Sequence, residues 1–194
     1  MELVSQSSRR RGLLVKLMAA GFMVVSLAVA FVAVQASAAN LALGRPYTIT
    51  ILDRNDQHVQ IEASYPDTNG KELTDGIKAA EPKYADAAWV GTLRQGGRDV
   101  VIDLGKSASI NKVIARFLGD TSVGIMLPEL VEVSFSNDGV KFSDPIMLDP
   151  TVDAEGPVIV PYEGAFSGIK ARFVKVTWVN NVWIFCDEIE VLGS

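Results

Sequence analysis

The chain has 194 residues and a formal net charge of −5; 48% of its residues are hydrophobic and 21% are charged. Residues 1–38 carry a net charge of +3, so the remainder carries −8. An acidic remainder argues against binding to nucleic acid, which needs a basic face to release counterions, and against binding to anionic lipid head groups. A single cysteine excludes an intrachain disulfide, and one histidine with one cysteine excludes the usual zinc site.

The first 38 residues have the order of features found in a secretory signal peptide. Basic residues at 9–11 and 16 precede an uncharged, mostly apolar run over 17–34, which we expect to be a signal helix, and Ala36-Ser37-Ala38 supplies the small-residue cleavage pattern. We therefore predict cleavage before Ala39 and a secreted or cell-envelope location for residues 39–194. The apolar run is also long enough for an uncleaved anchor, and the paired arginines also resemble a twin-arginine signal. Either alternative leaves residues 39–194 outside the membrane in the same compartment.

Residues 39–194 have the period-two alternation of β-strands in most of their length. The runs cover 100–104, 110–117, 131–136, 158–160, 171–178 and 184–192. Alternating runs separated by turn residues are typical of an antiparallel sandwich or barrel. Helix signals are thin: the window 72–88 contains some helix formers, and Ala79-Ala80-Glu81 suits a single turn that Pro82 stops. A length of about 156 residues suits one domain with its own core, so we predict a single all-β domain.

The longest stretch without strand signals runs from 53 to 89, and a loop of that length in a compact domain is usually functional. It contains Thr74-Asp75-Gly76, preceded by the oxygen-bearing side chains of Asp67, Thr68, Asn69 and Glu72. Calcium prefers six to eight oxygen ligands, and a glycine lets the chain wrap so that carbonyls converge. Taken alone, this local sequence favours an ordinary turn over a cation site.

A set of short motifs follows one order along residues 40–193. The motifs are Asn40-Leu41-Ala42, Leu73-Thr74-Asp75-Gly76, Trp89, Val101-Ile102-Asp103-Leu104-Gly105, Ile110, Pro128, the run 131–139, the run 171–176 and the closing run 187–193. Each piece is weak, but the ordered set resembles the discoidin, or coagulation-factor type C, family. That family overlaps the galactose-binding-like carbohydrate-binding modules. The resemblance implies a jelly-roll-like β-sandwich of about eight antiparallel strands.

The resemblance also implies a structural calcium ion between the Asp-Gly loop and a carboxylate near the C-terminus. Carried over residue by residue, Asp75 and Glu188 provide carboxylate oxygens, and backbone carbonyls of about Glu72 and Asp187 complete much of the shell. An ion there would pin the long loop to the last strand. The alternative is a loop held by hydrogen bonds alone, with Glu188 solvated at a strand edge.

The chain departs from the family pattern between the Asp-Gly pair and the tryptophan. The family places these a few residues apart, with a serine or threonine ligand between them. Here residues 77–88 intervene and contain neither. We assign Asp86 to the missing ligand position and Trp89 to the position of the family's core tryptophan.

Four residues are predicted to bind a ligand. Sugar-binding members of the family hold their ligand on loops at one end of the sandwich, where an exposed aromatic ring can stack on a sugar and polar groups can bond its hydroxyls. Trp183, which follows Asn180-Asn181 and is expected in a loop, would provide the ring. Tyr65, Arg94 and Asp120 complete the set. The alternative is that these residues serve packing and turns only.

No catalytic constellation emerges from the sequence. There is no Gly-x-Ser-x-Gly elbow and no phosphate loop. Cys186 lies in an apolar run and is expected to be a buried, inert thiol, and His58 is expected at the surface. We therefore predict a secreted, non-catalytic module that binds a glycan or cell-surface polymer, with no oligomeric state assigned. The alternatives are an adhesive or structural domain that binds a protein or surface polymer and, less favoured, a small glycan hydrolase.

Overall fold

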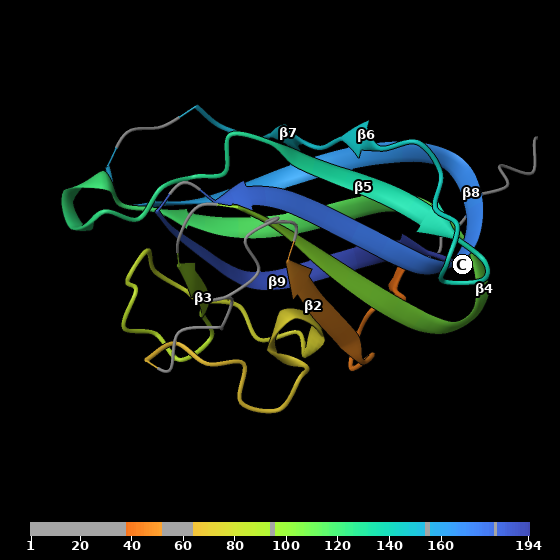
Figure 1. Ribbon diagram of the computed structural model, residues 1–194, viewed down its shortest axis with the longest axis horizontal. Helices are drawn as coiled ribbons and strands as arrows, with labels where there is room; N and C mark the ends of the chain where they lie inside the picture. The colour runs from red at the N-terminus through yellow and green to blue at the C-terminus, as the bar shows by residue number, and fades with distance from the viewer. Residues whose placement is uncertain (1–37, 52–63, 94–95, 154–155, 181) are drawn as a thin grey trace, which may run out of the picture. The chain divides into compact units, whose positions relative to one another are not determined.

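Nine β-strands and two short 3₁₀ helices make up the described part of the chain (Figure 1). The computed structural model describes residues 38–51, 64–93, 96–153, 156–180 and 182–194, so His58, Arg94 and all of the predicted signal 1–38 except its last residue lie outside the described residues. The strands are β1 (Ala39–Asn40), β2 (Tyr47–Ile51), β3 (Val90–Leu93), β4 (Gly96–Gly119), β5 (Val131–Ser136), β6 (Ile146–Met147), β7 (Asp149–Pro150), β8 (Val158–Asn180) and β9 (Trp183–Gly193). The helices are η1 (Glu72–Thr74) and η2 (Thr121–Val123).

All strand pairs in these residues are antiparallel, and the strands form one curled sheet. Its main path runs β1-β9-β4-β8-β5-β6, while β2 pairs with β4, β3 with β9 and β7 with β8. The first part of β4 lies between β2 and β8, whereas its second part lies between β9 and β8. The two long strands thus change partners along their length, which closes the sheet into a sandwich around the core.

Two expected strand ends are wrong, because β4 continues past Gly105 and β8 continues past Pro161. Gly105 has a φ of 82°, and its N–H donates to Asp103 Oδ1 at 2.8 Å. The ladder with β8 shifts register between Asp103 and Ala108 and then resumes, as a β-bulge allows. Pro161 lacks an N–H, but its carbonyl accepts a hydrogen bond from Thr151 N at 2.9 Å. Neither residue therefore ends its strand.

The apolar side chains of the longer strands are buried in two clusters. The larger cluster includes Phe117, Val133, Val176 and Trp178, all at most 1% exposed. The smaller cluster lies beside it and contains Ala79, Ala88, Trp89, Leu118, Ile125 and Phe185. Trp89 is 1% exposed, which confirms its predicted place in the core. Cys186 is buried as expected, and burial raises the pKa of its thiol well above the usual range.

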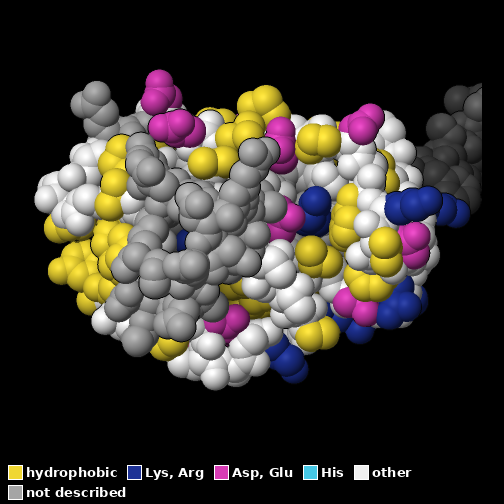
Figure 2. All heavy atoms as spheres, viewed as in Figure 1, with side chains coloured by type: hydrophobic (Ala, Val, Ile, Leu, Met, Phe, Trp, Pro, Cys, Tyr) yellow, Lys and Arg dark blue, Asp and Glu magenta, His cyan; other side chains and the backbone are white. Residues whose placement is uncertain are grey.

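Several charged side chains on the surface form pairs with opposite charges. Arg172 forms two hydrogen bonds with Asp103, at 2.8 and 2.7 Å, and Lys112 pairs with Glu163 at 2.5 Å. Figure 2 likewise shows basic side chains beside acidic ones on the face in view. In the part of the chain that is described, no helix is long and apolar enough to cross a membrane.

Candidate functional site

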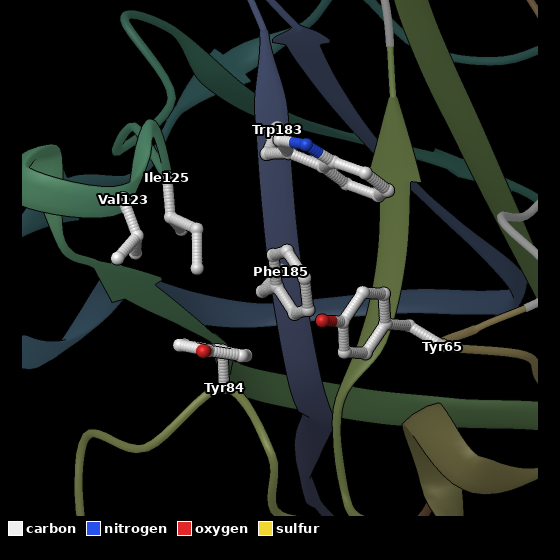
Figure 3. Close-up of a pocket in the computed structure, with 6 residues that line it drawn as sticks. All are labelled: Tyr65, Tyr84, Val123, Ile125, Trp183 and Phe185. Atoms are coloured by element: carbon white, nitrogen blue, oxygen red, sulfur yellow. The ribbon is translucent and has the colours of Figure 1, made fainter.

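Six side chains line a pocket of about 230 Å³ on one side of β9 (Figure 3). They are Tyr65, Tyr84, Val123, Ile125, Trp183 and Phe185, and we call this site the aromatic pocket. Trp183 and Phe185 are two residues apart in β9, so the pleat of the strand points both side chains to the same face. Three of the other four come from the segments 81–85 and 121–125, which are distant from β9 in sequence.

Edge-to-face aromatic contacts hold the rings of the pocket in place. Tyr65 lies 5.6 Å from Trp183, 4.7 Å from Phe185 and 6.4 Å from Tyr84, measured between ring centroids, with interplanar angles of 71–83°. Aromatic pairs at such distances and angles stabilise each other by about 0.5–1.5 kcal/mol beyond area burial. Beneath them, the smaller apolar cluster forms the floor. The pocket is therefore preformed by packing.

Backbone contacts explain why Tyr65 reaches β9. Gly91 N donates to Tyr65 O at 3.1 Å, and a Cβ on Gly91 would stand only 2.9 Å from Tyr65 Cβ. The absence of a side chain at Gly91 is thus what admits Tyr65. Tyr47 Oη donates to Asp67 Oδ2 at 2.7 Å, which fastens the segment that carries Tyr65 to β2.

Turn contacts place Tyr84 on the other wall. Trp89 Nε1 donates to Lys83 O at 3.0 Å, and Asp86 N donates to the same carbonyl at 3.0 Å. The carboxylate of Asp86 accepts from Ala88 N at 3.0 Å. These bonds fold residues 83–89 over the buried Trp89 ring, while Tyr84 remains 41% exposed.

The structure brings together two of the four predicted ligand-binding residues, Tyr65 and Trp183. The expectation that Trp183 is loop-borne is wrong: it opens β9, and its carbonyl accepts from Met126 N at 2.9 Å. Asp120 lies in an adjacent pocket, where its Oδ1 accepts from Ser122 N and Oγ, at 3.2 and 2.6 Å. Arg94 falls outside the described residues.

Four residues of the aromatic pocket were missed by the sequence analysis. Phe185 stands in an apolar run that is equally typical of core, and Val123 and Ile125 carry no signal of a site. Tyr84 did carry a signal of a site, because it is an aromatic residue in the long loop, outside the alternating strands that form the core. Its position depends on contacts with Trp89 that no local pattern encodes.

The pocket wall combines the surface of rings and aliphatic groups with exposed polar atoms. Its only side-chain polar atoms among the described lining residues are the hydroxyls of Tyr65 and Tyr84 and the indole nitrogen of Trp183. Ligand sites that combine aromatic surface with a small number of placed polar groups suit compact organic rings. This arrangement can bind a ring, but it contains no group suited to act as a nucleophile or general base near neutral pH.

A second group of predicted residues lies where the long loop meets β9. Gly76 N donates to Glu188 Oε2 at 3.0 Å, and Ala79 N donates to Asp187 Oδ2 at 2.9 Å. Lys78 Nζ pairs with Glu190 at 2.6 Å. Asp75, next to Gly76, accepts from Ile77 N at 2.7 Å. The structure thus attaches residues 76–79 to the last strand through its acidic side chains.

Two carboxylate oxygens at this junction are buried without a hydrogen-bond partner among the described residues: Asp187 Oδ1 and Glu188 Oε1. Burial raises the pKa of Glu188 to about 7, and the negative charges of Asp75 and Glu190 add to the rise. Burial also raises the pKa of Asp187 to about 6, although Arg116, whose Nη1 lies 2.9 Å from Asp187 Oδ2, opposes the shift. Buried acids with free oxygens fit a bound cation.

The remaining predicted ligands have other contacts. The carboxylate of Glu72 accepts from the backbone N–H of Thr68 at 2.9 Å and from the Thr68 hydroxyl. These bonds use the side chain of Glu72 and not its backbone carbonyl, so the role of that carbonyl as a calcium ligand stays a prediction. Asp86 bonds Ala88, as described above, and its place as a ligand stays a prediction. No group of three or more His, Cys, Asp or Glu side chains is arranged as a metal site within the described ranges.

Comparison with known proteins gives matches among solved structures. No family model and no curated protein matches the chain. The lectin domain of lectinolysin, solved with Lewis b antigen, is 21% identical, with a TM-score of 0.59 over 82% of this chain and 99% of that one. A fucose-binding module of Streptococcus pneumoniae, SpX-3, is 13% identical, with a TM-score of 0.53 over 79% and 96%. Chitosan-binding module 1 of the chitosanase/glucanase from Paenibacillus sp. IK-5 is 17% identical, with a TM-score of 0.51 over 80% and 99%.

These likenesses span 96–99% of each matched chain and 79–82% of this one. The chain therefore has the galactose-binding-like β-sandwich fold that its ordered motifs implied, and it shares that fold with carbohydrate-binding modules and lectin domains.

Proposed function

We propose that this chain is an exported, non-catalytic module that binds glycans in the aromatic pocket. The observation that carries the proposal is the pocket itself: Tyr65, Tyr84, Trp183 and Phe185 gathered around one recess of a sandwich. The three matched structures, named for binding Lewis b, fucose and chitosan, support the same ligand class.

The physical argument rests on the two kinds of surface that a sugar presents. The C–H faces of a pyranose are apolar and pack against aromatic rings, while its hydroxyls need hydrogen-bond partners. The pocket offers ring surface together with two tyrosine hydroxyls and an indole N–H. A volume of about 230 Å³ is suited to a single ring.

Export is part of the proposal. The first strand of the described residues, β1, begins at Ala39, directly after the predicted cleavage site. The acidic character of the remainder is compatible with an exported domain. Mass spectrometry of the secreted protein should give an N-terminus at Ala39, and retention of residues 1–38 would favour the anchored alternative.

Calcium is proposed as a structural ion at the junction of the long loop with β9. The side chains of Asp75 and Glu188 and the carbonyls of Glu72 and Asp187 would hold it. The buried, unpartnered Glu188 Oε1 supports this choice. The ion would supply positive charge that offsets the crowded acids, and it would take no part in glycan chemistry.

A glycan array tests the function. The array should include L-fucose, the Lewis b oligosaccharide, glucosamine and chitosan oligomers, with both the wild type and a Trp183→Ala variant applied. We expect wild-type binding to at least one glycan and a loss of ten-fold or more in Trp183→Ala, because the variant removes the largest ring of the pocket.

Met147→Ala is the matched control, since Met147 is 57% exposed on β6 and lies outside the pocket. It should bind as the wild type does. Binding to no glycan on the array would overturn the proposal and favour an adhesive domain that recognises protein. Release of product from any bound polysaccharide would instead indicate a hydrolase.

A further inference from the structure

A second pocket, of about 560 Å³, adjoins the aromatic pocket. Its wall includes Tyr84 and the neighbouring Glu81, Lys83 and Ala85. Asp120 and Pro157, which are distant from them in sequence, also line it. Tyr84 lines both pockets, so the two recesses lie on either side of one side chain.

Backbone pairing joins the pockets independently of Tyr84. Asp120 N donates to Ile125 O at 2.9 Å, and Ile125 N donates to Asp120 O at 3.0 Å. Asp120 belongs to the second pocket and Ile125 to the aromatic pocket, so one two-way bridge spans both. Pro157 is brought to the same place because β4 and β8 pair at Gly119 and Val158.

The two pockets differ in size and chemistry. The aromatic pocket is small and lined by rings and aliphatic groups. The second pocket is larger and combines the apolar Pro82, Ala85 and Pro157 with charged groups. Lys83 and Glu81 pair with each other there and remain largely exposed. Most of the accessible lining of the second pocket is nevertheless apolar. A ring in the first pocket would thus have a larger space beside it, with apolar surface for a further sugar ring and a few charged groups for its hydroxyls.

Building on the proposed function, we infer that the ligand is an oligosaccharide of at least two units rather than a monosaccharide. One unit occupies the aromatic pocket, and the next occupies the second pocket across Tyr84. The volume of the aromatic pocket supports the same inference, because about 230 Å³ lies below the range of about 300–1,000 Å³ that is usual for the binding pockets of larger organic ligands.

Calorimetric titration with matched probes tests the inference. The probes are the glycans bound on the array, each beside its terminal monosaccharide, beginning with Lewis b oligosaccharide against L-fucose and chitosan trimer against glucosamine. We expect the oligosaccharide to bind at least ten-fold more tightly than its monosaccharide. Equal affinity for both would overturn the inference and leave the proposed function standing, whereas no binding at all would overturn both.

Variants that fill the second pocket test whether this pocket provides the higher affinity for the oligosaccharide. Ala85 and Ala87 are both exposed, but only Ala85 lines the pocket. Ala85→Trp should abolish the oligosaccharide advantage and preserve monosaccharide binding, and Ala87→Trp should preserve both. Pro157→Trp, at another residue that lines the second pocket, should likewise abolish the oligosaccharide advantage. It replaces Ala85→Trp in the test if that variant does not fold. An oligosaccharide advantage that persists in every pocket-filling variant that folds would overturn the assignment.

Discussion

At the scale of single residues, the pocket depends on side chains that are absent as well as on those present. Gly91 is the clearest case, because its missing Cβ leaves room for Tyr65 and for the Phe185 ring, which would stand 2.9 and 3.1 Å away. The sequence gives no sign of this role, since a glycine within a short strand equally predicts a bulge or a weak strand.

Gly91→Ala should therefore destabilise the fold by about 1–3 kcal/mol, the usual cost of overpacking. It should also weaken glycan binding, because Tyr65 must move away from Trp183. Urea unfolding and titration of the array glycan measure the two effects. A variant that unfolds and binds as the wild type does would mean that the Tyr65 segment shifts freely and that its packing does not define the pocket.

The proposed calcium site gives a second prediction at the scale of single residues. Asp75→Ala should lower the melting temperature in calcium and remove the difference between calcium and chelator. For the wild type that difference corresponds to about 2.7 kcal/mol when calcium is a hundred times its Kd.

The matched control is Asp144→Ala, an exposed aspartate of the 137–145 turn, which should leave the calcium response unchanged. Differential scanning calorimetry of all three proteins makes the comparison. A wild type that melts at one temperature in calcium and chelator would rule out the ion site.

At the scale of elements, the first and last strands hold each other. Asn40 Oδ1 accepts hydrogen bonds from Ala42 N and Val191 N, both at 3.1 Å, so one amide ties β1 and its following turn to β9. The same β9 provides Trp183 and Phe185 to the aromatic pocket. Loss of this tie would thus act on the strand that carries the site.

Asn40→Ala should cost about 1–3 kcal/mol of stability, because two backbone N–H groups lose their acceptor. Chemical denaturation provides the measurement, with Asn111→Ala, exposed on β4, as the control. If Asn40→Ala and Asn111→Ala unfold at the same denaturant concentration, β1 contributes little to the stability of the sheet.

At the scale of the whole molecule, the junction of loop and strand links stability to pH. The folded protein raises the pKa of Glu188 from 4.5 to about 7 and that of Asp187 from 3.8 to about 6, mainly through burial. Between about pH 4 and 7 the folded state therefore binds more protons than the unfolded state. Stability of the metal-free protein must fall as pH rises through this window.

In chelator, lowering the pH from 7.5 to 5.5 should therefore stabilise the protein by about 1–3 kcal/mol. In calcium the trend should reverse, because the ion binds the carboxylates in their charged form and protons compete with it. Thermal unfolding at a series of pH values, with and without calcium, separates the cases. A metal-free protein that loses stability on acidification over this range would contradict the burial of these acids.

The sequence by itself determined the all-β class and the order of the main strands, because alternation with period two is a local property that burial of one sheet face imposes on the chain. The family resemblance of its ordered motifs, rather than alternation, placed Trp89 in the core. It also selected Tyr65 and Trp183. Only the tertiary structure decided that β4 and β8 run on through Gly105 and Pro161, since pairing with partner strands sustains the bulge after Asp103 and holds Pro161 in register opposite Arg116. Only the tertiary structure added Tyr84, Val123, Ile125 and Phe185 to the site, because a pocket is made by contacts between segments that are far apart in sequence.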